Sequence, residues 1–165
     1  MAHRSTDQFR FWKEQEEFAN FFPCRIEQLG VTDGVAYPSA EHFFQAHKTL
    51  EDAQRRRVAE ASFERVYSLG RCLTLRPDWE TVKLQVMLEA AQLKYQQNPS
   101  LAAALAQTKG EMTFTPSAGF WGVDETGRGE NWNGRIHAAV RAQLVGDVQT
   151  YEKLYAELLA RCKQM

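Results

Sequence analysis

The chain has 165 residues, of which 44% are hydrophobic and 25% are charged, and its formal net charge is −1. These are ordinary globular values, and the length fits one compact domain over residues 1–165. The near-neutral charge argues against a protein held on nucleic acid by bulk electrostatics, because such proteins usually carry a basic excess.

The cysteines and the hydropathy pattern indicate the cellular environment. Cys24, Cys72 and Cys162 are odd in number and widely spaced, so neither a disulfide framework nor a zinc pattern is visible. No apolar run has the length of a signal peptide or a membrane span. We therefore expect a cytoplasmic protein with no membrane association, while its oligomeric state stays open.

Short strands are expected in the first forty residues. Apolar and aromatic residues predict strands at 9–12, 25–29 and 35–37, and Asp33-Gly34 before the last of them is a hairpin signal. Pro38 ends this run. Ser39 is then placed to cap a helix whose first turn contains Glu41.

The rest of the chain has mainly helical spacing. Apolar residues predict helices at 51–69, 79–97, around 101–105, 135–145 and 148–162, with a strand at 112–115. Asp78 reads as the N-cap of the long helix, and Asn98-Pro99 ends it. We expect an α+β fold: a predominantly α-helical single domain with a small β-sheet near the N-terminus.

Residues 39–48 form the first candidate site. At 100° per residue, Glu41, Gln45 and Lys48 fall on one narrow helix face, with Phe44 beside them. Because both flanks are apolar, we expect this helix to be buried nearly all round, so that Glu41 and Lys48 face each other or a pocket. The alternative is that Glu41 only complements the helix N-terminus and Lys48 is a surface charge.

Residues 120–134 form the second candidate site. Their glycines permit tight turns and close approach to a ligand, Asp124 and Asn131 supply polar groups, and Trp121 supplies a flat stacking face. Backbone N–H groups near Gly134-Arg135, at the start of a helix, are placed to hold a phosphate. The alternative is a long surface loop built from turn residues.

Other familiar chemistries lack their motifs. Gly127-x-Gly129 has no third glycine at the offset of a dinucleotide fingerprint, and the acidic spacing is not that of a calcium loop. His42 and His47 are five residues apart, which does not match the i, i+4 spacing of a helical metal pair. We therefore expect neither a metal nor a cofactor.

In combination, these segments resemble the NADAR family, also called YbiA-like, in order from about Phe9 to Val145. The matching pieces are Asn20-Phe21-Phe22-Pro23, Tyr37-Pro38-Ser39-Ala40-Glu41-His42-Phe43-Phe44-Gln45-Ala46-His47-Lys48, Arg76-Pro77-Asp78-Trp79 with Lys83 and Met87, and Phe120-Trp121-Gly122 with Gly129 and Asn131. The sequence departs from the family pattern at Gly119, where members commonly have an acidic residue, and at Asn133, where they have Leu.

The resemblance implies a largely helical α+β fold and metal-free hydrolysis of an N-glycosidic bond. Family members act on phosphorylated ribosyl intermediates of riboflavin synthesis, or remove ADP-ribose from guanine bases in DNA. The expected partner is therefore a ribosyl-phosphate or ADP-ribosyl substrate, with ADP-ribosylated DNA as one form of it. Carried over by position, the catalytic residues are Glu41, Trp121 and Asp124. The residues expected to bind substrate are Asn20, Phe21, Phe44, Gln45, Lys48, Lys83, Gly122 and Asn131.

Cleavage of a ribose C1′–N bond builds positive charge on the sugar ring, which a nearby carboxylate stabilises. We assign Glu41 to this role and to water activation, and Asp124 to ribose positioning or leaving-group protonation, with the reverse order as the alternative. Trp121 stacks on the base or sugar, and Lys48 and Lys83 meet phosphate. A second class of function is an ADP-ribose or NAD sensor without turnover, although two acids beside an anionic ligand favour the enzyme.

The near-neutral charge favours a small-molecule substrate over DNA. A single flipped nucleotide, however, needs only a local basic rim. Arg55-Arg56-Arg57, or Arg128 with Arg135, would supply such a rim, although the simplest interpretation of residues 55–57 is a solvated helix face.

Overall fold

The computed structural model describes residues 8–11, 17–28, 34–115 and 119–165. Its helices are α1 (Ala40–Ala46), α2 (Asp52–Ala59), α3 (Val66–Gly70), α4 (Trp79–Gln97), α5 (Pro99–Gln107), α6 (Trp132–Val145) and α7 (Val148–Cys162). Its strands are β1 (Gln8–Phe11), β2 (Ile26–Glu27), β3 (Ala36–Tyr37) and β4 (Glu111–Phe114). In the part of the chain so described, no helix is both long and apolar enough to cross a bilayer.

The predicted α+β fold with a small N-terminal sheet is confirmed. Strands β2 and β3 pair antiparallel, with Ile26 opposite Tyr37, as the hairpin signal predicts, although the connecting residues 29–33 lie outside the described part. Strand β1 pairs in parallel with β4, with Phe11 opposite Phe114. That second pairing joins distant parts of the chain and leaves no local signal in the sequence.

The helix predicted over 51–69 is wrong, because the structure divides it into α2 and α3. Between them the chain turns so that its backbone and an aromatic ring cover His42 of α1. The His42 Nε2 atom lies 3.0 Å from the carbonyl oxygen of Ala61, and the Phe63 ring packs edge-on against the imidazole at 4.8 Å. A continuous helix would carry these groups away from α1.

The predicted caps have different outcomes. Ser39 is confirmed as the N-cap of α1, since its hydroxyl accepts the His42 N–H at 3.2 Å. Asp78 occupies the N-cap position of α4 but makes no capping bond, because Arg76 engages both of its carboxylate oxygens, at 2.6 and 2.9 Å. At the other end of α4, the side chain of Asn98 donates to the carbonyl of Lys94.

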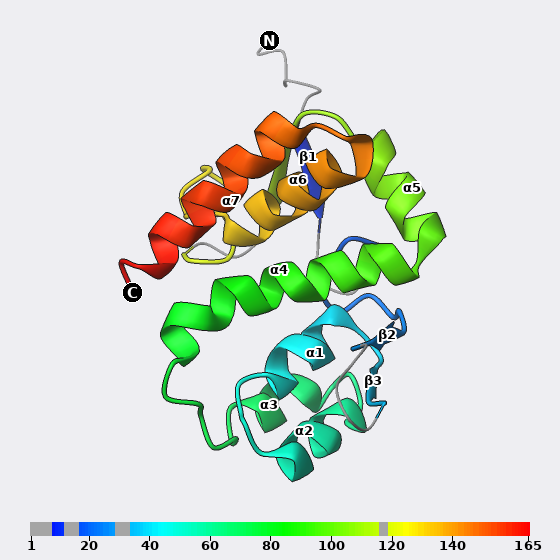
Figure 1. Ribbon diagram of the computed structural model, residues 1–165, viewed down its shortest axis with the longest axis vertical. Coiled ribbons are helices and arrows are strands. Elements are labelled where there is room, and N and C mark those ends of the chain that lie inside the picture. The colour runs from blue at the N-terminus through cyan, green and yellow to red at the C-terminus, as the bar shows by residue number, and fades with distance from the viewer. Residues whose placement is uncertain (1–7, 12–16, 29–33, 116–118) are drawn as a thin grey trace.

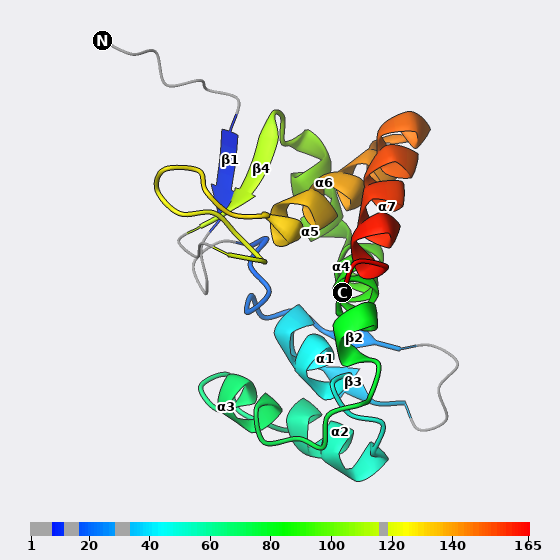
Figure 2. The ribbon, with the colours of Figure 1, turned by 90° about the vertical axis from the view of Figure 1, so that its left-hand side faces the viewer.

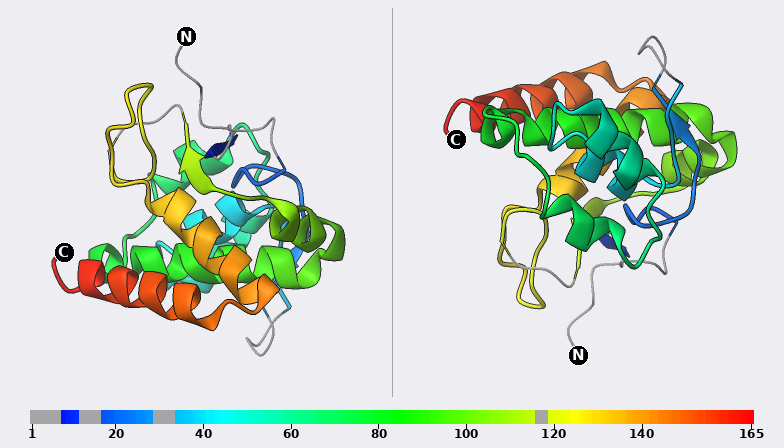
Figure 3. Two further views of the ribbon diagram at one scale, coloured as in Figure 1. Left: turned by 90° about the horizontal axis from the view of Figure 1, so that it is seen from above. Right: turned by 90° about the horizontal axis from the view of Figure 1, so that it is seen from below.

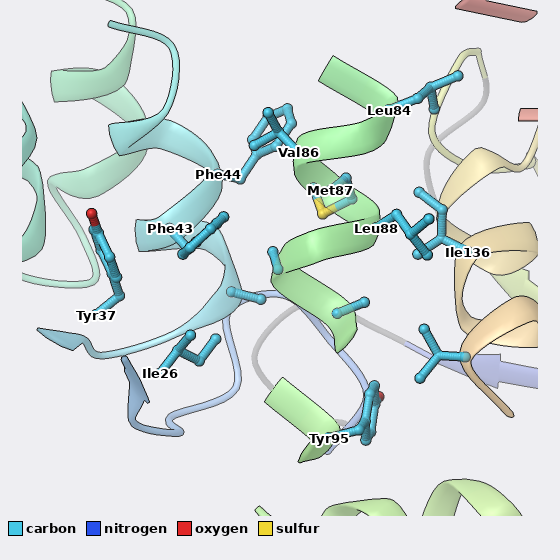
Figure 4. Packing of buried hydrophobic residues seen from close by; sticks show 14 of the residues in the cluster. Ile26, Tyr37, Phe43, Phe44, Leu84, Val86, Met87, Leu88, Tyr95 and Ile136 are labelled. Carbon is cyan, nitrogen blue, oxygen red and sulfur yellow. The ribbon is translucent and has the colours of Figure 1, made fainter. Parts of the chain in front are cut away.

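The long helix α4 runs through the centre of the molecule, with α1, α2 and α3 on one side and α5, α6 and α7 on the other (Figure 1). Figure 4 shows Phe43 and Phe44 of α1 facing one side of α4, while Leu88 on another side meets Ile136 of α6. Helix α7 lies along both α6 and α4 (Figure 3). Packing on several sides explains why the buried residues of α4, such as Val86 and Leu88, are not confined to one face of the helix.

Two buried histidines predict how stability depends on pH. Burial lowers the pKa of His47, and of His137 in α6, from 6.5 to about 4. Between these values the unfolded chain binds protons that the folded chain does not, so the free energy of unfolding falls as pH decreases. At pH 5 the expected loss is about 2 kcal/mol for each histidine.

Urea unfolding at pH 7 and pH 5 measures this loss. Burial lowers the pKa of His42 as well, so this histidine adds to the loss. His47→Gln removes one of these titrations, so the difference between the two pH values should shrink by about 2 kcal/mol, whatever the stability of the variant at pH 7. A wild-type protein that is equally stable at both pH values would contradict the assignment.

Candidate active site

Glu41 lies at the start of α1 and is 6% exposed. Its backbone N–H donates to the carbonyl of Asn20 at 2.9 Å, and its carboxylate accepts a hydrogen bond from the Gln45 amide at 2.7 Å. All seven residues of α1 are buried, as the apolar flanks of this segment predict. The backbone of Glu41 is therefore held by the segment before α1, and its buried carboxylate is oriented by Gln45.

The segment that contains Asn20 is itself held by a buried lysine. Lys94 of α4 is 1% exposed, and its ammonium group donates to the carbonyls of Glu17 and Ala19 at 2.7 and 3.0 Å. Burial lowers the pKa of Lys94 to about 8. Through this contact α4 fixes the backbone against which the N–H of Glu41 is bonded.

Gln45 makes a close approach to α3. Its side-chain oxygen is buried and has no hydrogen-bond partner among the described residues. A Cβ atom on Gly70 would lie 1.9 Å from this oxygen, so only glycine leaves room for the amide that orients Glu41. Gly70 thus contributes to the site without supplying a functional group.

Aromatic rings from separate elements form a wall beside Glu41. The ring of Phe44 lies 5.0 Å from that of Trp79, and it meets Trp121 edge-to-face at 5.3 Å. Trp121 in turn contacts Phe120 edge-to-face at 4.9 Å. The wall joins α1 and α4 to the loop of residues 119–131, which projects on the β1–β4 side of the molecule (Figure 2).

Two lysines lie against this aromatic wall. The Lys48 ammonium group is 5.8 Å from the centre of the Phe44 ring and 6.0 Å from that of Trp79. Burial lowers the pKa of Lys48, while the negative charge of Glu41 opposes that shift. Lys83 forms an ion pair with Glu80 and lies 4.4 Å from the Phe120 ring. Positive charge thus flanks the aromatic wall at two places.

The Asp124 carboxylate is engaged by its own loop. It accepts hydrogen bonds from the backbone N–H and the hydroxyl of Thr126, at 2.9 and 2.6 Å, and from the backbone N–H of Arg128 at 3.0 Å. These bonds, that of the Thr126 hydroxyl above all, lower the pKa of Asp124. The carboxylate is therefore ionised near neutral pH and stabilises a turn.

Asn131 ties the end of the loop to β4. Its amide oxygen accepts the Phe114 N–H at 3.0 Å, and its amide nitrogen donates to the Met112 carbonyl at 2.8 Å. Its backbone is left-handed, with φ of 55°, a conformation that Asn adopts more readily than most residues. The N–H of Asn131 also bonds to the carbonyl of Gly122, which closes the loop on itself.

The predicted phosphate site at the start of α6 is wrong, because the loop occupies the helix N-terminus. Helix α6 begins at Trp132 rather than at 135, and the N–H groups of Trp132 and Asn133 donate to the carbonyls of Phe120 and Trp121, at 3.2 and 3.0 Å. The N–H of Arg135 bonds to Asn131 within the helix. The helix end therefore holds the Phe120-Trp121 backbone in place.

The structure brings most of the predicted residues together, with differences in how their side chains are used. Glu41, Phe44, Gln45, Lys48 and Trp121 are linked by the contacts described above, and Lys83 joins them through Phe120. The remaining predicted residues take part through their backbone, support the loop or lie in the core: Asn20, Phe21, Gly122, Asp124 and Asn131.

Several contributing residues are missing from the sequence prediction. Trp79 and Phe120 lie within the recognised motifs, so motif membership was the available signal. Gly70 has no such signal, because its role depends on the fold. Within the ranges that the structure describes, no three histidine, cysteine or acidic side chains lie close enough to hold a metal ion.

A buried carboxylate, aromatic faces and lysine charges thus lie together in one region of the molecule, a combination suited to a flat, anionic ligand. Residues 10–145 match the family model described as the NADAR domain, and the chain belongs to this family. N-glycosidase YbiA of Escherichia coli strain K12 is 34% identical over 133 residues, which are 78% of this chain and 81% of that protein.

Two further relatives and one solved structure support the same relationship. N-glycosidase Npun_R5314 of Nostoc punctiforme is 30% identical over 82% of this chain and 90% of its own length. The chloroplastic riboflavin biosynthesis protein PYRR of Zea mays is 30% identical over 85% of this chain but only 25% of that protein. The NMR structure of E. coli YbiA superposes with a TM-score of 0.72 at 30% identity, covering 86% of each chain.

Proposed function

We propose that this protein hydrolyses the bond between ribose C1′ and nitrogen in a small phosphorylated N-riboside of the kind formed in riboflavin synthesis. Membership of the NADAR family, together with N-glycosidase relatives that match over most of their length, makes the protein a hydrolase of N-glycosyl bonds. The observation that carries the proposal is the Glu41 carboxylate, buried and oriented by Gln45 beside the aromatic wall.

In the proposed mechanism, Glu41 supplies the negative charge that the reaction requires. As the C1′–N bond breaks, positive charge develops on the ribose ring, and a carboxylate in a water-poor setting stabilises that charge strongly. The same carboxylate accepts a proton from the water that attacks C1′, while the departing nitrogen keeps the electron pair of the broken bond and takes up a proton from solvent. The hydrogen bond from Gln45 fixes the geometry of the carboxylate before substrate arrives.

The other groups bind and orient substrate. The face of Trp121 stacks on the base or sugar, and Lys48 and Lys83 attract the phosphate. Asp124 is assigned to shaping the loop and through it the ribose site. An ionised carboxylate held by several donors is poorly suited to protonating a leaving group, so this role is favoured over that of general acid.

Two observations favour a small molecule over ADP-ribosylated DNA. Three of the arginines that would form a basic rim already have acceptors within the protein: Arg128 pairs with Asp124, Arg135 pairs with Glu157, and Arg55 donates to the Thr49 carbonyl, whereas Arg56 and Arg57 are exposed. In addition, two relatives, from Zea mays and Vibrio vulnificus, are named as riboflavin biosynthesis proteins. ADP-ribosyl-guanine in DNA is the second candidate substrate, supported by the same catalytic arrangement.

Parallel assays with both substrates test the proposal. The purified protein is incubated with a phosphoribosylated riboflavin intermediate, with an oligonucleotide carrying ADP-ribosylated guanine, and with free ADP-ribose, and the released sugar is measured by mass spectrometry. We expect release of ribose 5-phosphate from the first substrate. Release from the oligonucleotide alone would transfer the assignment to DNA. Binding of free ADP-ribose without cleavage of either substrate would establish a sensor instead.

A further inference from the structure

An arginine near the end of α7 reaches back to the loop of residues 119–131. Arg161 lies beyond residues 10–145, which the family model matches. Its guanidinium donates to both carboxylate oxygens of Glu130, at 2.8 and 3.0 Å. Glu130 also accepts the indole N–H of Trp132 at 2.7 Å. A bidentate pair of this kind restricts geometry more than a single contact between charges.

The same guanidinium also contacts the aromatic wall. Its central carbon lies 5.3 Å from the Phe120 ring, and Lys83 lies 4.4 Å from that ring. Phe120 thus interacts with two cations from different helices, α7 and α4. Since Phe120 is the direct neighbour of Trp121 and contacts it edge-to-face, fixing Phe120 restricts Trp121.

We propose that Arg161 is a positioning residue for the active site, which holds Trp121 against Phe44 through Glu130 and Phe120. The role in turnover rests on the proposed function, whereas the effect on the loop does not. Other hydrogen bonds fix the loop at Asn131, at the start of α6, between the Val123 N–H and the Phe114 carbonyl, and between Arg135 and the Glu130 carbonyl. Arg161 adds a restraint from another element, which reduces the ordering that substrate binding requires.

The charge of Glu130 makes the ion pair with Arg161 a permanent restraint on the loop. Arg161 and the Trp132 indole lower the pKa of Glu130 to about 2, so the carboxylate keeps its charge at every pH at which the enzyme is expected to work. The loop is therefore held by an ionised pair rather than by a titrating one.

The chain offers a matched control for Arg161→Gln. Arg135 of α6 and Glu157 of α7 form a second ion pair, at 3.1 Å, and Arg135 has a separate hydrogen bond to the Glu130 carbonyl, at 3.0 Å, that does not depend on Glu157. Glu157→Gln therefore removes an ion pair of α7 while leaving the Arg161–Glu130 pair intact. Arg161→Lys serves as a conservative variant, because it keeps the charge and loses the bidentate geometry.

Steady-state kinetics and tryptophan quenching by acrylamide form the test. For Arg161→Gln we expect KM to rise about tenfold with kcat within about threefold of wild type, because a poorly held Trp121 weakens binding in ground and transition states alike. Glu130→Gln should raise KM by the same factor, and the double variant should raise it no further than either single variant. The KM of Arg161→Lys should lie between those of wild type and Arg161→Gln. Acrylamide should quench Arg161→Gln more strongly than Glu157→Gln or wild type.

The outcomes separate this inference from the proposed function. Of the four tryptophans, Trp121 lies in the loop and Trp132 directly follows it, so a change in quenching between Arg161→Gln and wild type reports on the loop without any substrate. Quenching therefore tests the restraint even if wild-type protein cleaves none of the compounds. Equal quenching of Arg161→Gln and wild type would overturn the proposal. So would a lower kcat at unchanged KM, which indicates a smaller folded fraction rather than a displaced Trp121.

Discussion

Glu41→Gln is expected to lower turnover of the N-riboside substrate by about 10²–10⁴-fold, the usual contribution of a positioned proton-transfer group. The amide keeps the size of the side chain and can still accept the hydrogen bond from Gln45, so the fold should be retained. What is lost is the negative charge beside the ribose and the base that accepts a proton from water. Single-turnover kinetics with saturating enzyme measure this loss independently of product release.

Glu60→Gln is the matched control for this experiment. Glu60 is an exposed carboxylate at the end of α2, and neutralising it alters the net charge by the same amount without touching the site. We expect its rate to stay within about twofold of wild type. Near-normal turnover by a folded Glu41→Gln protein would refute the catalytic assignment.

Gly129→Ala is expected to disrupt the loop of residues 119–131. Gly129 has φ of 143°, and a Cβ atom there would lie 2.0 Å from the carbonyl oxygen of Gly122, which is backbone and has little room to move. Because this carbonyl also accepts the Asn131 N–H, the added methyl group displaces the loop next to Trp121. Displacement by about 1 Å costs on the order of 10²-fold in rate. The free energy of unfolding should fall by about 3 kcal/mol.

Gly127→Ala separates backbone strain from this collision. Gly127 also has a positive φ, of 83°, but a Cβ atom there meets nothing within 4 Å. We expect this variant to lose about 1–2 kcal/mol of stability and to keep activity within a few-fold of wild type. Thermal unfolding and turnover of the two variants are compared side by side; equal effects would contradict the role of the Gly122 contact.

Local sequence signals predicted much of this fold. Ser39 caps α1, and helices 79–97 and 148–162 follow from apolar spacing, because capping and helix periodicity depend on residues only a few positions apart. The shared face of Glu41 and Gln45 follows from the same helix geometry, and the hydrogen bond between them confirms it.

What the sequence did not predict depends on contacts between distant residues. The break between α2 and α3 serves to cover His42, and the start of α6 is occupied by the carbonyls of Phe120 and Trp121. Arg161 and Glu130 are 31 residues apart, so their pairing leaves no periodic signal. Helix propensity and residue spacing carry no information on which backbone groups a folded loop will hydrogen-bond.

The turn built by Asp124 separates the tip of the loop from the rest of the domain. Thr126 and Arg128 bond back to Asp124, and the Gly127 N–H bonds to the Asp124 carbonyl, so the tip is stabilised internally. Insertions at this exposed tip should therefore leave the fold intact. The tip is a suitable position for a fluorescent reporter of substrate binding, because it lies on the same loop as Trp121.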